Sequence, residues 1–224
     1  MAPVSIALTL VAAALAAWAA AAWAIQARRA RALAAAGEAV GLRFDAVDPF
    51  NLPESHSALA LLARGHSRLA WNVLHGRRDG LSVRLCDYQY ETGRAGHRRS
   101  HRYQVALVHG ELDWPALLCQ PADQRDPADE CFGLAEVPFA VEPFASRFRV
   151  ASESADFAFS FLHSELADLL AANPLVTVQT CGDTLAIWRA GLAASADAVG
   201  LLDLACRIHQ SAPPALREEL RSTG

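Results

Sequence analysis

The segment from Gly65 to Val108 decides the fold, and it reads GHSRLAWNVLHGRRDGLSVRLCDYQYETGRAGHRRSHRYQVALV. Apolar residues alternate with polar or smaller ones on both sides of GRRDG, residues 76–80, and this pattern is typical of two strands joined by a turn. The chain turns again within residues 91–100, where two glycines give the backbone freedom, and returns along residues 101–108. Two successive hairpins predict an antiparallel sheet.

The rest of the chain predicts further strands and several helices around these hairpins. Between Ser154 and Ala172, apolar residues recur at helical spacing until Pro174 ends the pattern. We expect strands at 115–119 and 137–150, a third hairpin at 175–189 that turns at CGDT, and helices at 55–64, 154–172 and 195–209. Strands joined by hairpins, with the helices segregated from them, predict an α+β domain of mainly antiparallel strands packed with a few helices.

The N-terminus carries a long uncharged stretch. Residues 2–25 hold no charged side chain and, as a helix, are long enough to cross a hydrocarbon core of roughly 30 Å. Trp18 and Trp23 lie in its second half, and three arginines follow within residues 28–31. We therefore expect a single-pass transmembrane helix retained in the bacterial inner (plasma) membrane, with the N-terminus outside and the domain in the cytoplasm. The alternative is a signal peptide that is cleaved and a domain that is exported.

Composition and length fit one globular domain with an apolar appendage. The chain has 224 residues, of which 53% are hydrophobic and 20% are charged, and this balance argues against intrinsic disorder. We divide the chain into an anchor at 1–27, a helical stalk at 28–42, a cytoplasmic α+β domain at 43–210 and a flexible C-terminal tail at 211–224. The five cysteines are odd in number and form no CxxC pair, so we expect reduced, mostly buried thiols.

Two further segments join the hairpins in a resemblance to a known family. FASRFRVASESADFAFSFLHSEL, residues 144–166, and GDTLAIW, residues 182–188, accompany residues 65–108. Together they resemble a family of uncharacterised bacterial proteins with one N-terminal membrane helix and a cytoplasmic domain of unknown function. The resemblance implies that this chain is attached to a membrane. It implies no activity, cofactor or catalytic residue.

Charge is distributed unevenly along the chain. Residues 64–102 hold nine arginines against three acids, a net charge of +6, whereas residues 103–224 hold seven arginines against 17 acids, a net charge of −10. Six arginines fall in or beside the two predicted hairpin turns: Arg77, Arg78, Arg94, Arg98, Arg99 and Arg102. We predict that they form a basic face that binds anionic lipid or another anionic partner, at about 1 kcal/mol per side chain near a lipid surface. The plainer alternative is two solvated turns, and the net acidity of the chain argues against nucleic acid.

Patterns for catalysis and metal binding are weak. His97 and His101 are four residues apart, but they lie in a predicted turn among arginines that repel a divalent cation, so we expect no metal site and no cofactor. Asp87 lies within a predicted strand, and a carboxylate buried there needs a partner, for which Arg84 and Tyr103 are candidates. A structural ion pair or hydrogen bond is our expectation for Asp87. The alternative is a catalytic acid.

A binding or scaffolding role follows from these observations. The sequence contains no nucleophile elbow and no glycine-rich phosphate loop. We therefore predict a single-pass membrane-anchored protein whose cytoplasmic domain binds or scaffolds rather than catalyses. The alternative function is a membrane-tethered hydrolase or transferase with its site around Asp87.

Overall fold

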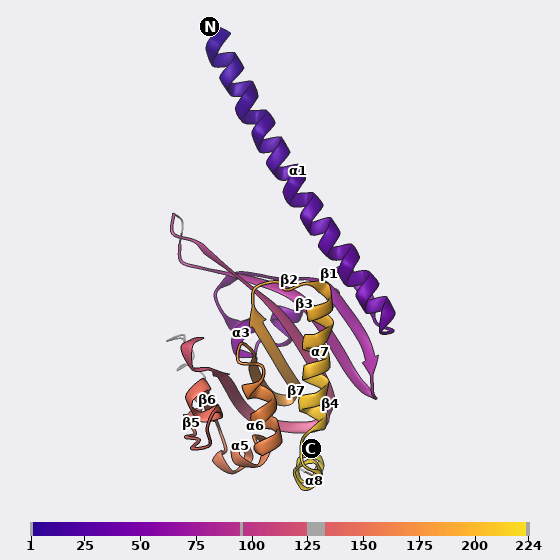
Figure 1. The fold of residues 1–224 in the computed structure, drawn as a ribbon, viewed down its shortest axis with the longest axis vertical. Helices are drawn as coiled ribbons and strands as arrows, with labels where there is room; N and C mark the ends of the chain where they lie inside the picture. The colour runs from indigo at the N-terminus through magenta and orange to yellow at the C-terminus, as the bar shows by residue number, and fades with distance from the viewer. Residues whose placement is uncertain (1, 95, 125–132, 223–224) are drawn as a thin grey trace.

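The fold is one antiparallel sheet with helices on both faces (Figure 1). A computed structural model describes residues 2–94, 96–124 and 133–222, with side chains from residue 12 to residue 221 within those ranges. The strand order is β1-β2-β3-β4-β6-β5, and β7 also pairs with β4. The strands are β1 (Arg43–Val47), β2 (His66–Arg78), β3 (Leu81–Thr92), β4 (Arg99–Pro121), β5 (Ala135–Glu136), β6 (Phe148–Ser152) and β7 (Thr177–Ala190). This confirms the predicted α+β class with antiparallel strands.

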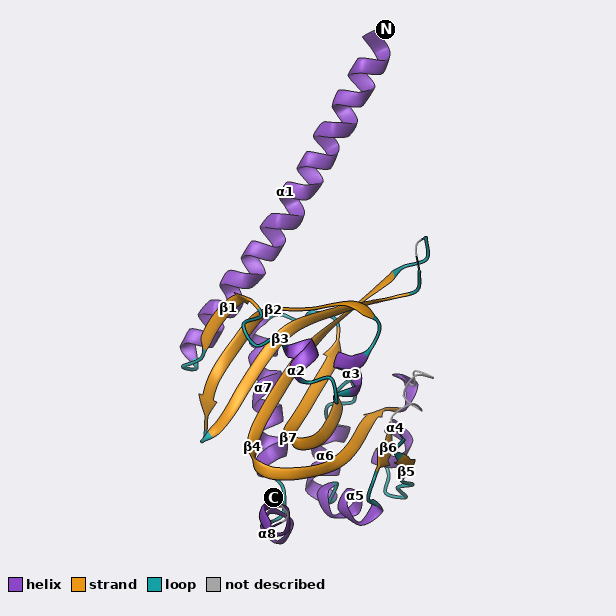
Figure 2. Ribbon diagram, turned by 180° about the vertical axis from the view of Figure 1, so that it is seen from behind, coloured by secondary structure: helices purple, strands orange, loops and turns teal. Residues whose placement is uncertain are grey.

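Helices form a layer on each side of the sheet. In Figure 1, α7 lies along the near face with α5 and α6 beside it, and Figure 2 shows α2 and α3 on the opposite face. The long helix α1 packs against β1 and α7 with its C-terminal part and extends away from the sheet with its N-terminal part (Figure 1). The helices are α1 (Ala2–Ala39), α2 (Leu52–Ser55), α3 (Ala60–Ala63), α4 (Phe144–Arg147), α5 (Ala155–Phe161), α6 (Ser164–Ala171), α7 (Ser195–Gln210) and α8 (Pro214–Ser222).

Both faces of the central strands are buried. Along β3, Val83 and Leu85 belong to the core that includes α7, whereas Cys86 and Tyr88 belong to the core that includes α2 and α3. Because successive strand residues face opposite sides, four consecutive residues of β4, 105–108, are all buried. A fully buried large apolar side chain contributes about 1.5–3 kcal/mol, so the sheet is stabilised from both sides.

The first two hairpins form as predicted. β2 and β3 pair up to a turn at Asp79 and Gly80, and Gly80 takes a positive φ of 83° that suits glycine. β3 and β4 then pair continuously over 11 residue pairs, between Ser82↔His109 and Thr92↔Arg99. The alternation of apolar residues in the sequence therefore identified both the strands and their pairing.

The predicted third hairpin is wrong, because residues 177–190 form one strand. β7 pairs with β4 on both sides of Gly182, which lies opposite Trp114 and has a φ of +57°. Gly182 lies at an irregularity of the ladder, and the strand continues past it instead of reversing. The predicted strand at 115–119 is likewise the second half of β4, a strand of 23 residues that pairs with β3 first and with β6 later.

Three predicted elements are divided or replaced by shorter ones. The helix expected at 154–172 is divided into α5 and α6. Between them, Nε2 of His163 donates to the Ser211 carbonyl at the end of α7 (2.9 Å), and this tertiary contact stabilises the interruption. The helix expected at 55–64 is replaced by the short helices α2 and α3. The segment at 137–150, predicted to be extended, holds α4 before it enters β6.

The C-terminal segment contains a helix that packs against the core. Residues 214–222, predicted as part of a flexible tail, form α8, and its Leu216 and Leu220 are buried against the core. Apolar burial on one side of the helix explains this packing.

Cys131 lies outside the described residues. The four cysteines within them are free thiols, of which three are buried.

Helix α1 is continuous through the predicted stalk, up to Ala39. Among the residues whose side chains are described, however, no helix is long and apolar enough to cross a membrane. In that part of α1 the apolar residues are mostly alanine, and Gln26, Arg28 and Arg29 interrupt them. This finding contradicts the prediction of a transmembrane anchor at 2–25. The prediction of a single-pass membrane protein depends on that anchor and is wrong as well. The location of the domain, which rests on that anchor, stays a prediction.

A buried ion pair joins α1 to the sheet. Asp87 is 1% exposed, and the guanidinium of Arg29 donates two hydrogen bonds to its carboxylate, both of 2.6 Å. Asn72 of β2 donates a third bond of 3.0 Å to the same carboxylate. Arg29 also donates to the carbonyl of Ala193, just before α7. One arginine therefore connects α1, the sheet and the start of α7.

We predict that Arg29→Met lowers the free energy of unfolding by about 3 kcal/mol or more, because it leaves a buried carboxylate without its cation. Urea denaturation followed by circular dichroism measures the change. Adding Asp87→Asn to that variant recovers part of the loss, since an amide carries no charge. The matched control is Arg28→Met at the neighbouring exposed position, which changes stability by less than about 0.5 kcal/mol. Equal losses at the two arginines would contradict the role of the pair.

Candidate functional site

The six arginines predicted to form a basic face lie at opposite ends of β3. Arg77 and Arg78 belong to the β2–β3 turn, where Arg77 donates to the Gly80 carbonyl (2.9 Å) and Arg78 pairs with Asp203 of α7. The other four belong to the β3–β4 hairpin: Arg94, Arg98, Arg99 and Arg102. A strand of 12 residues separates the two turns by roughly 35 Å. The arginines therefore do not share one face, and their binding of anions stays a prediction.

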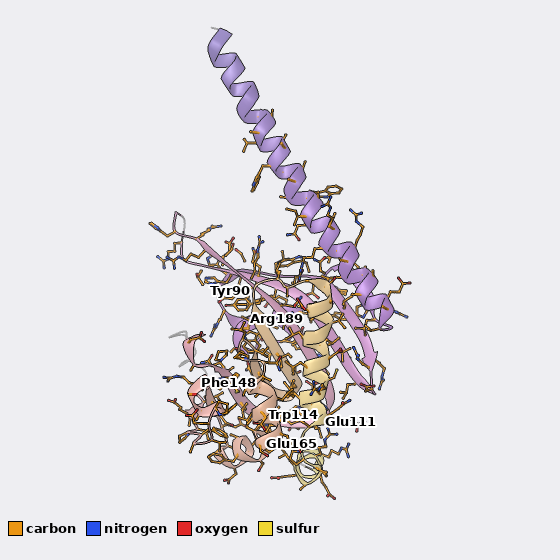
Figure 3. The ribbon with its side chains drawn as sticks, in the orientation of Figure 1. Tyr90, Glu111, Trp114, Phe148, Glu165 and Arg189 are labelled. Atoms are coloured by element: carbon orange, nitrogen blue, oxygen red, sulfur yellow. The ribbon has the colours of Figure 1, made fainter. Side chains whose placement is uncertain are left out.

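The β3–β4 hairpin tip projects beyond the sheet (Figures 1 and 2). At its base, the ring of Tyr90 stacks on His101 (4.9 Å between centroids) and on Tyr103 (5.8 Å), and Figure 3 shows Tyr90 where the hairpin leaves the body of the domain. Beyond this stack the side chains are exposed, and Arg98 lies 3.5 Å from the carboxylate of Glu91. The aromatic stack stiffens the base of an otherwise solvated tip.

Asp87, the alternative catalytic acid, is a structural residue. The predicted ion pair is confirmed, but the partner is Arg29 rather than Arg84 or Tyr103. Arg84 is three residues away along the strand, and Tyr103 pairs with Tyr88, so both side chains face the other side of the sheet. A buried carboxylate held by a guanidinium and an amide is not placed to exchange a proton with a substrate.

A cleft of about 640 Å³ opens on the α2 and α3 side of the sheet, within the size range of small-molecule sites. Its floor is one cross-strand row, in which Ser82 of β3 lies opposite His109 of β4 and His109 lies opposite Thr184 of β7. Further along the same face these strands carry apolar core residues, so the cleft begins where that core ends. We name it the Arg84 cleft, and its main lining residues are Phe50, His56, Ser82, Arg84, His109 and Thr184.

The loop before α2 and the end of α2 form the opposite wall. Asp48 accepts hydrogen bonds from the backbone N–H of Phe50 (2.9 Å) and of the first residue of α2 (2.6 Å), and so holds the entry to the helix. The guanidinium carbon of Arg84 lies 4.4 Å from the centre of the Phe50 ring. At the end of α2, Nδ1 of His56 lies 2.8 Å from the Ser55 hydroxyl. The wall therefore presents one aromatic ring and one imidazole to Arg84.

Arg84 determines where both imidazoles carry their proton. Its Nη1 lies 3.0 Å from Nε2 of His109 and 3.4 Å from Nε2 of His56. A guanidinium only donates hydrogen bonds, so both Nε2 atoms accept and both neutral rings carry the proton on Nδ1. Nδ1 of His109 then donates to Oγ1 of Thr184 (3.0 Å), whose hydroxyl donates to Asp183 (2.8 Å). The hydrogen bonds run in one direction, from Arg84 to Asp183.

The two imidazoles are held neutral. Burial, followed by the positive charge of Arg84, lowers the pKa of His109 to about 4, and Asp183 offsets part of that effect. The same two causes, in the same order, lower the pKa of His56. Burial lowers the pKa of Arg84 itself, while Asp48 and Asp183 raise it, and a guanidinium stays charged at neutral pH. The Arg84 cleft therefore contains one cation between two neutral rings.

The arrangement does not activate a nucleophile. His109 donates its Nδ1 proton to Thr184, so it does not act as the base that removes the proton of the Thr184 hydroxyl. Cys181 also lines the cleft, but burial raises the pKa of its thiol and keeps it protonated. Within the described residues, no three His, Cys, Asp or Glu side chains are placed to hold a metal ion. The geometry instead suits recognition of a polar group by a guanidinium that rests on an aromatic ring.

Sequence reasoning missed the Arg84 cleft. The sequence pattern suggests Arg84 only as a candidate partner of Asp87. One signal was present: Ser82 and Arg84 are polar at alternate positions of a strand whose next residues on that face are apolar, which indicates an open end of the face. That Thr184 completes the row depends on the pairing of β7 with β4, for which the local pattern predicts a hairpin instead.

Comparison with known proteins identifies a shared fold. Neither a protein-family model nor a curated protein sequence matches the chain. A solved structure that it resembles is the mycobacterial trehalose monomycolate transport factor A, TtfA, with a TM-score of 0.61 and 12% sequence identity. The match covers 83% of this chain and 96% of the TtfA chain. At this identity the likeness concerns the fold alone, and the resemblance to the bacterial family with an N-terminal membrane helix stays a prediction.

We predict that His109 takes up its ring proton near pH 4 instead of near 6.5, as an NMR titration of the ring would measure. Because this pKa is lower in the folded protein than in the unfolded chain, the contribution of His109 to stability is complete above pH 6.5 and is lost as the pH falls towards 4. Arg84→Gln raises the pKa of His109 by removing a neighbouring charge, whereas Arg207→Gln on an exposed position of α7 leaves it unchanged. A ring that titrates near pH 6.5 in the unaltered protein would refute the assignment.

Proposed function

We propose that this protein is a transport-associated binding factor that holds the polar head group of its ligand in the Arg84 cleft without converting it. The observation that carries the proposal is the arrangement around Arg84: its guanidinium rests on Phe50, and its hydrogen-bond partners in the described part of the chain are acceptor nitrogens of His56 and His109. A guanidinium held in this way donates hydrogen bonds to a ligand and attracts it through its positive charge.

Binding rather than catalysis is supported by the state of every reactive group considered above. His109 is committed as a donor to Thr184, the Cys181 thiol is protonated, and Asp87 is neutralised by Arg29 on the other side of the sheet. A cleft with a fixed cation and hydroxyl groups, but with no base beside a nucleophile, is typical of a recognition site.

The transport association is supported by the fold. TtfA, which shares the fold over 96% of its own chain, is named a trehalose monomycolate transport factor. One fold can host many functions, so we take only the association with transport from TtfA. The ligand is inferred from the side chains of this chain. Those side chains belong to the Arg84 cleft, which offers polar contacts at its floor and an aromatic ring at its wall.

A thermal denaturation series with three head-group probes tests the proposal: trehalose, inorganic phosphate and glycerol 3-phosphate. We expect at least one probe to raise the Tm of the full chain in a concentration-dependent way, because a ligand that binds only the folded state stabilises it. The same probe should leave the Tm of Arg84→Leu unchanged, and mass spectrometry should recover it intact after incubation.

The matched control for that series is Arg207→Leu, which removes an exposed arginine from α7 and should respond as the unaltered protein does. The proposal fails if no probe shifts the unaltered protein or if Arg84→Leu responds equally. Conversion of a probe into a product would replace binding with an enzymatic function.

A second candidate function is contact with an anionic lipid surface through the β3–β4 hairpin tip. The observation that favours it is the position of four arginines on one exposed tip that projects from the domain (Figure 2). Each arginine near such a surface contributes about 1 kcal/mol, and salt weakens the attraction. The alternative partner of the same tip is an acidic protein surface.

Co-sedimentation of the full chain with vesicles of phosphatidylcholine alone, or with phosphatidylglycerol added, tests this second function. We expect more protein to sediment with the anionic vesicles, and we expect Arg94, Arg98, Arg99 and Arg102 changed together to serine to abolish the difference. Changing Arg77 to serine at the opposite end of β3 is the control and should have no effect. If the fourfold variant sediments like the unaltered protein, the tip is a solvated turn.

A further inference from the structure

We infer that the Arg84 cleft is a phosphate-binding site, in which the guanidinium of Arg84 and the hydroxyl group of Ser82 contact a phosphate monoester of the ligand. This inference rests on the proposed function, because it names the chemistry of the head group that the cleft holds. Four observations carry it: the unneutralised charge of Arg84, the placement of the neighbouring acids, the directions of the donors and the volume of the cleft.

The charge of Arg84 is not neutralised by a carboxylate within the described part of the chain. Arg29 forms an ion pair with Asp87, and Arg68 forms one with Glu54. Arg84, in contrast, has the acceptor nitrogens of His56 and His109 as its hydrogen-bond partners. A neutral imidazole accepts the hydrogen bond but brings no negative charge, so the cleft retains a cation for an anionic ligand.

Two acids lie at the cleft: Asp183 is one of its lining residues, and Asp48 belongs to the loop before α2. Both oxygens of Asp48 accept backbone N–H groups, those of Phe50 and Leu52, which compensates this carboxylate within its own loop. Asp183 is 74% exposed, so water and salt screen its charge. The two acids therefore weaken the positive potential around Arg84, but they leave its guanidinium accessible to a ligand.

The hydrogen-bond directions in the cleft determine which donors a ligand can use. The guanidinium of Arg84 and the hydroxyl of Ser82, both on β3, are the donors left for a ligand, because Thr184 of β7 donates to Asp183 and both imidazoles accept from Arg84 through Nε2. Phe50 covers one flat side of the guanidinium and leaves its edge, where the N–H groups lie, for a ligand. A phosphate has three terminal oxygens, so it can accept from the edge of the guanidinium and from the Ser82 hydroxyl at the same time.

The cleft is larger than a phosphate ion, so the inferred phosphate is one part of a larger ligand. The cleft measures about 640 Å³, which suits a small organic molecule rather than a bare ion. Its lining also includes apolar side chains, among them Leu59 and Ala58 beside Phe50. A phosphate monoester therefore fits the site better than inorganic phosphate, because its organic part contacts these side chains.

Protonation of the two imidazoles strengthens the site. A proton on Nε2 of His56 or His109 converts an acceptor for Arg84 into a second cation that faces the cleft, so a bound anion favours the protonated rings. The charged groups that face these rings are Arg84 from β3, Asp48 from the loop before α2 and Asp183 from β7. Anion affinity should therefore rise as the pH falls, as long as the charge of the anion itself stays constant.

Isothermal titration calorimetry on the full chain at pH 6 tests the inference with inorganic phosphate, glycerol 3-phosphate and short-chain dihexanoyl phosphatidic acid. We expect the phosphate esters to bind the unaltered protein and Arg207→Leu equally, and Arg84→Leu at least about tenfold more weakly. Ser82→Tyr is the second variant. It places a bulky side chain at an exposed strand position, where it fills the cleft without disturbing the core, and it should weaken binding as well.

Sulfate is the probe for the imidazoles, because its charge is constant between pH 5 and pH 8. We expect its affinity for the unaltered protein to rise at least about threefold over that range as the pH falls. The double variant His56→Gln and His109→Gln keeps acceptors for Arg84 but cannot titrate, so its affinity should not change with pH. An affinity with the same pH dependence in both proteins would overturn the part assigned to these rings.

The results for the phosphate probes separate this inference from the proposed function. If trehalose binds through Arg84 and no phosphate probe binds, the phosphate inference falls and the binding function stands. If none of these probes binds, both fall, and equal binding to Arg84→Leu overturns the site itself. Among positive results, tighter binding of dihexanoyl phosphatidic acid than of glycerol 3-phosphate assigns the phosphate to a lipid head group, and the reverse order assigns it to a water-soluble ester.

Discussion

Burial of both faces of the sheet is the constraint on which the rest of this structure depends. Where β3, β4 and β7 lie between two layers of helices, a polar side chain on these strands must find its partner within the protein. Asp87 pairs with Arg29, Gln104 accepts from Arg189 (2.8 Å), and Gln179 accepts from a backbone N–H of α3 (2.8 Å). The pairs of Asp87 and Gln179 each join a helix to the sheet, and Arg189 of β7 also donates to the carbonyl of Asp197 in α7. These polar contacts therefore help to set how the helices lie on the sheet.

The docking of α1 shows this constraint most clearly. Arg29, Leu33 and Gly37 are spaced four residues apart and therefore lie on one side of the helix. Arg29 meets the buried carboxylate, Leu33 is 1% exposed in the core, and Gly37 lies so close to Leu74 that a Cβ there would clash with it. A charge, an apolar side chain and a close backbone approach thus determine one register for the C-terminal part of α1.

The Arg84 cleft arises where the second helical layer stops. α2 and α3 are only four residues long, and they cover the apolar rows of the sheet, whereas Ser82, at the end of the row with His109 and Thr184, stays exposed. At the boundary between buried and open surface, Arg84 is bonded to neutral rings, which satisfy its hydrogen bonds without neutralising its charge. The incomplete helical cover therefore leaves a cleft beside a charged guanidinium, and this is the physical basis of a binding site here.

The sequence by itself determined the α+β class, the first two hairpins, the helical C-terminal stretch at α7 and the need of Asp87 for a partner. These features depend on the alternation or the helical spacing of nearby residues, which the chain carries locally. The same local reasoning was wrong about a transmembrane anchor in α1 and about a hairpin at Gly182. Only the tertiary structure decided that Arg29 pairs with Asp87 and that residues from α2, β3, β4 and β7 meet at Arg84, because those contacts join segments that lie far apart along the chain, and no local pattern specifies which of them will be neighbours.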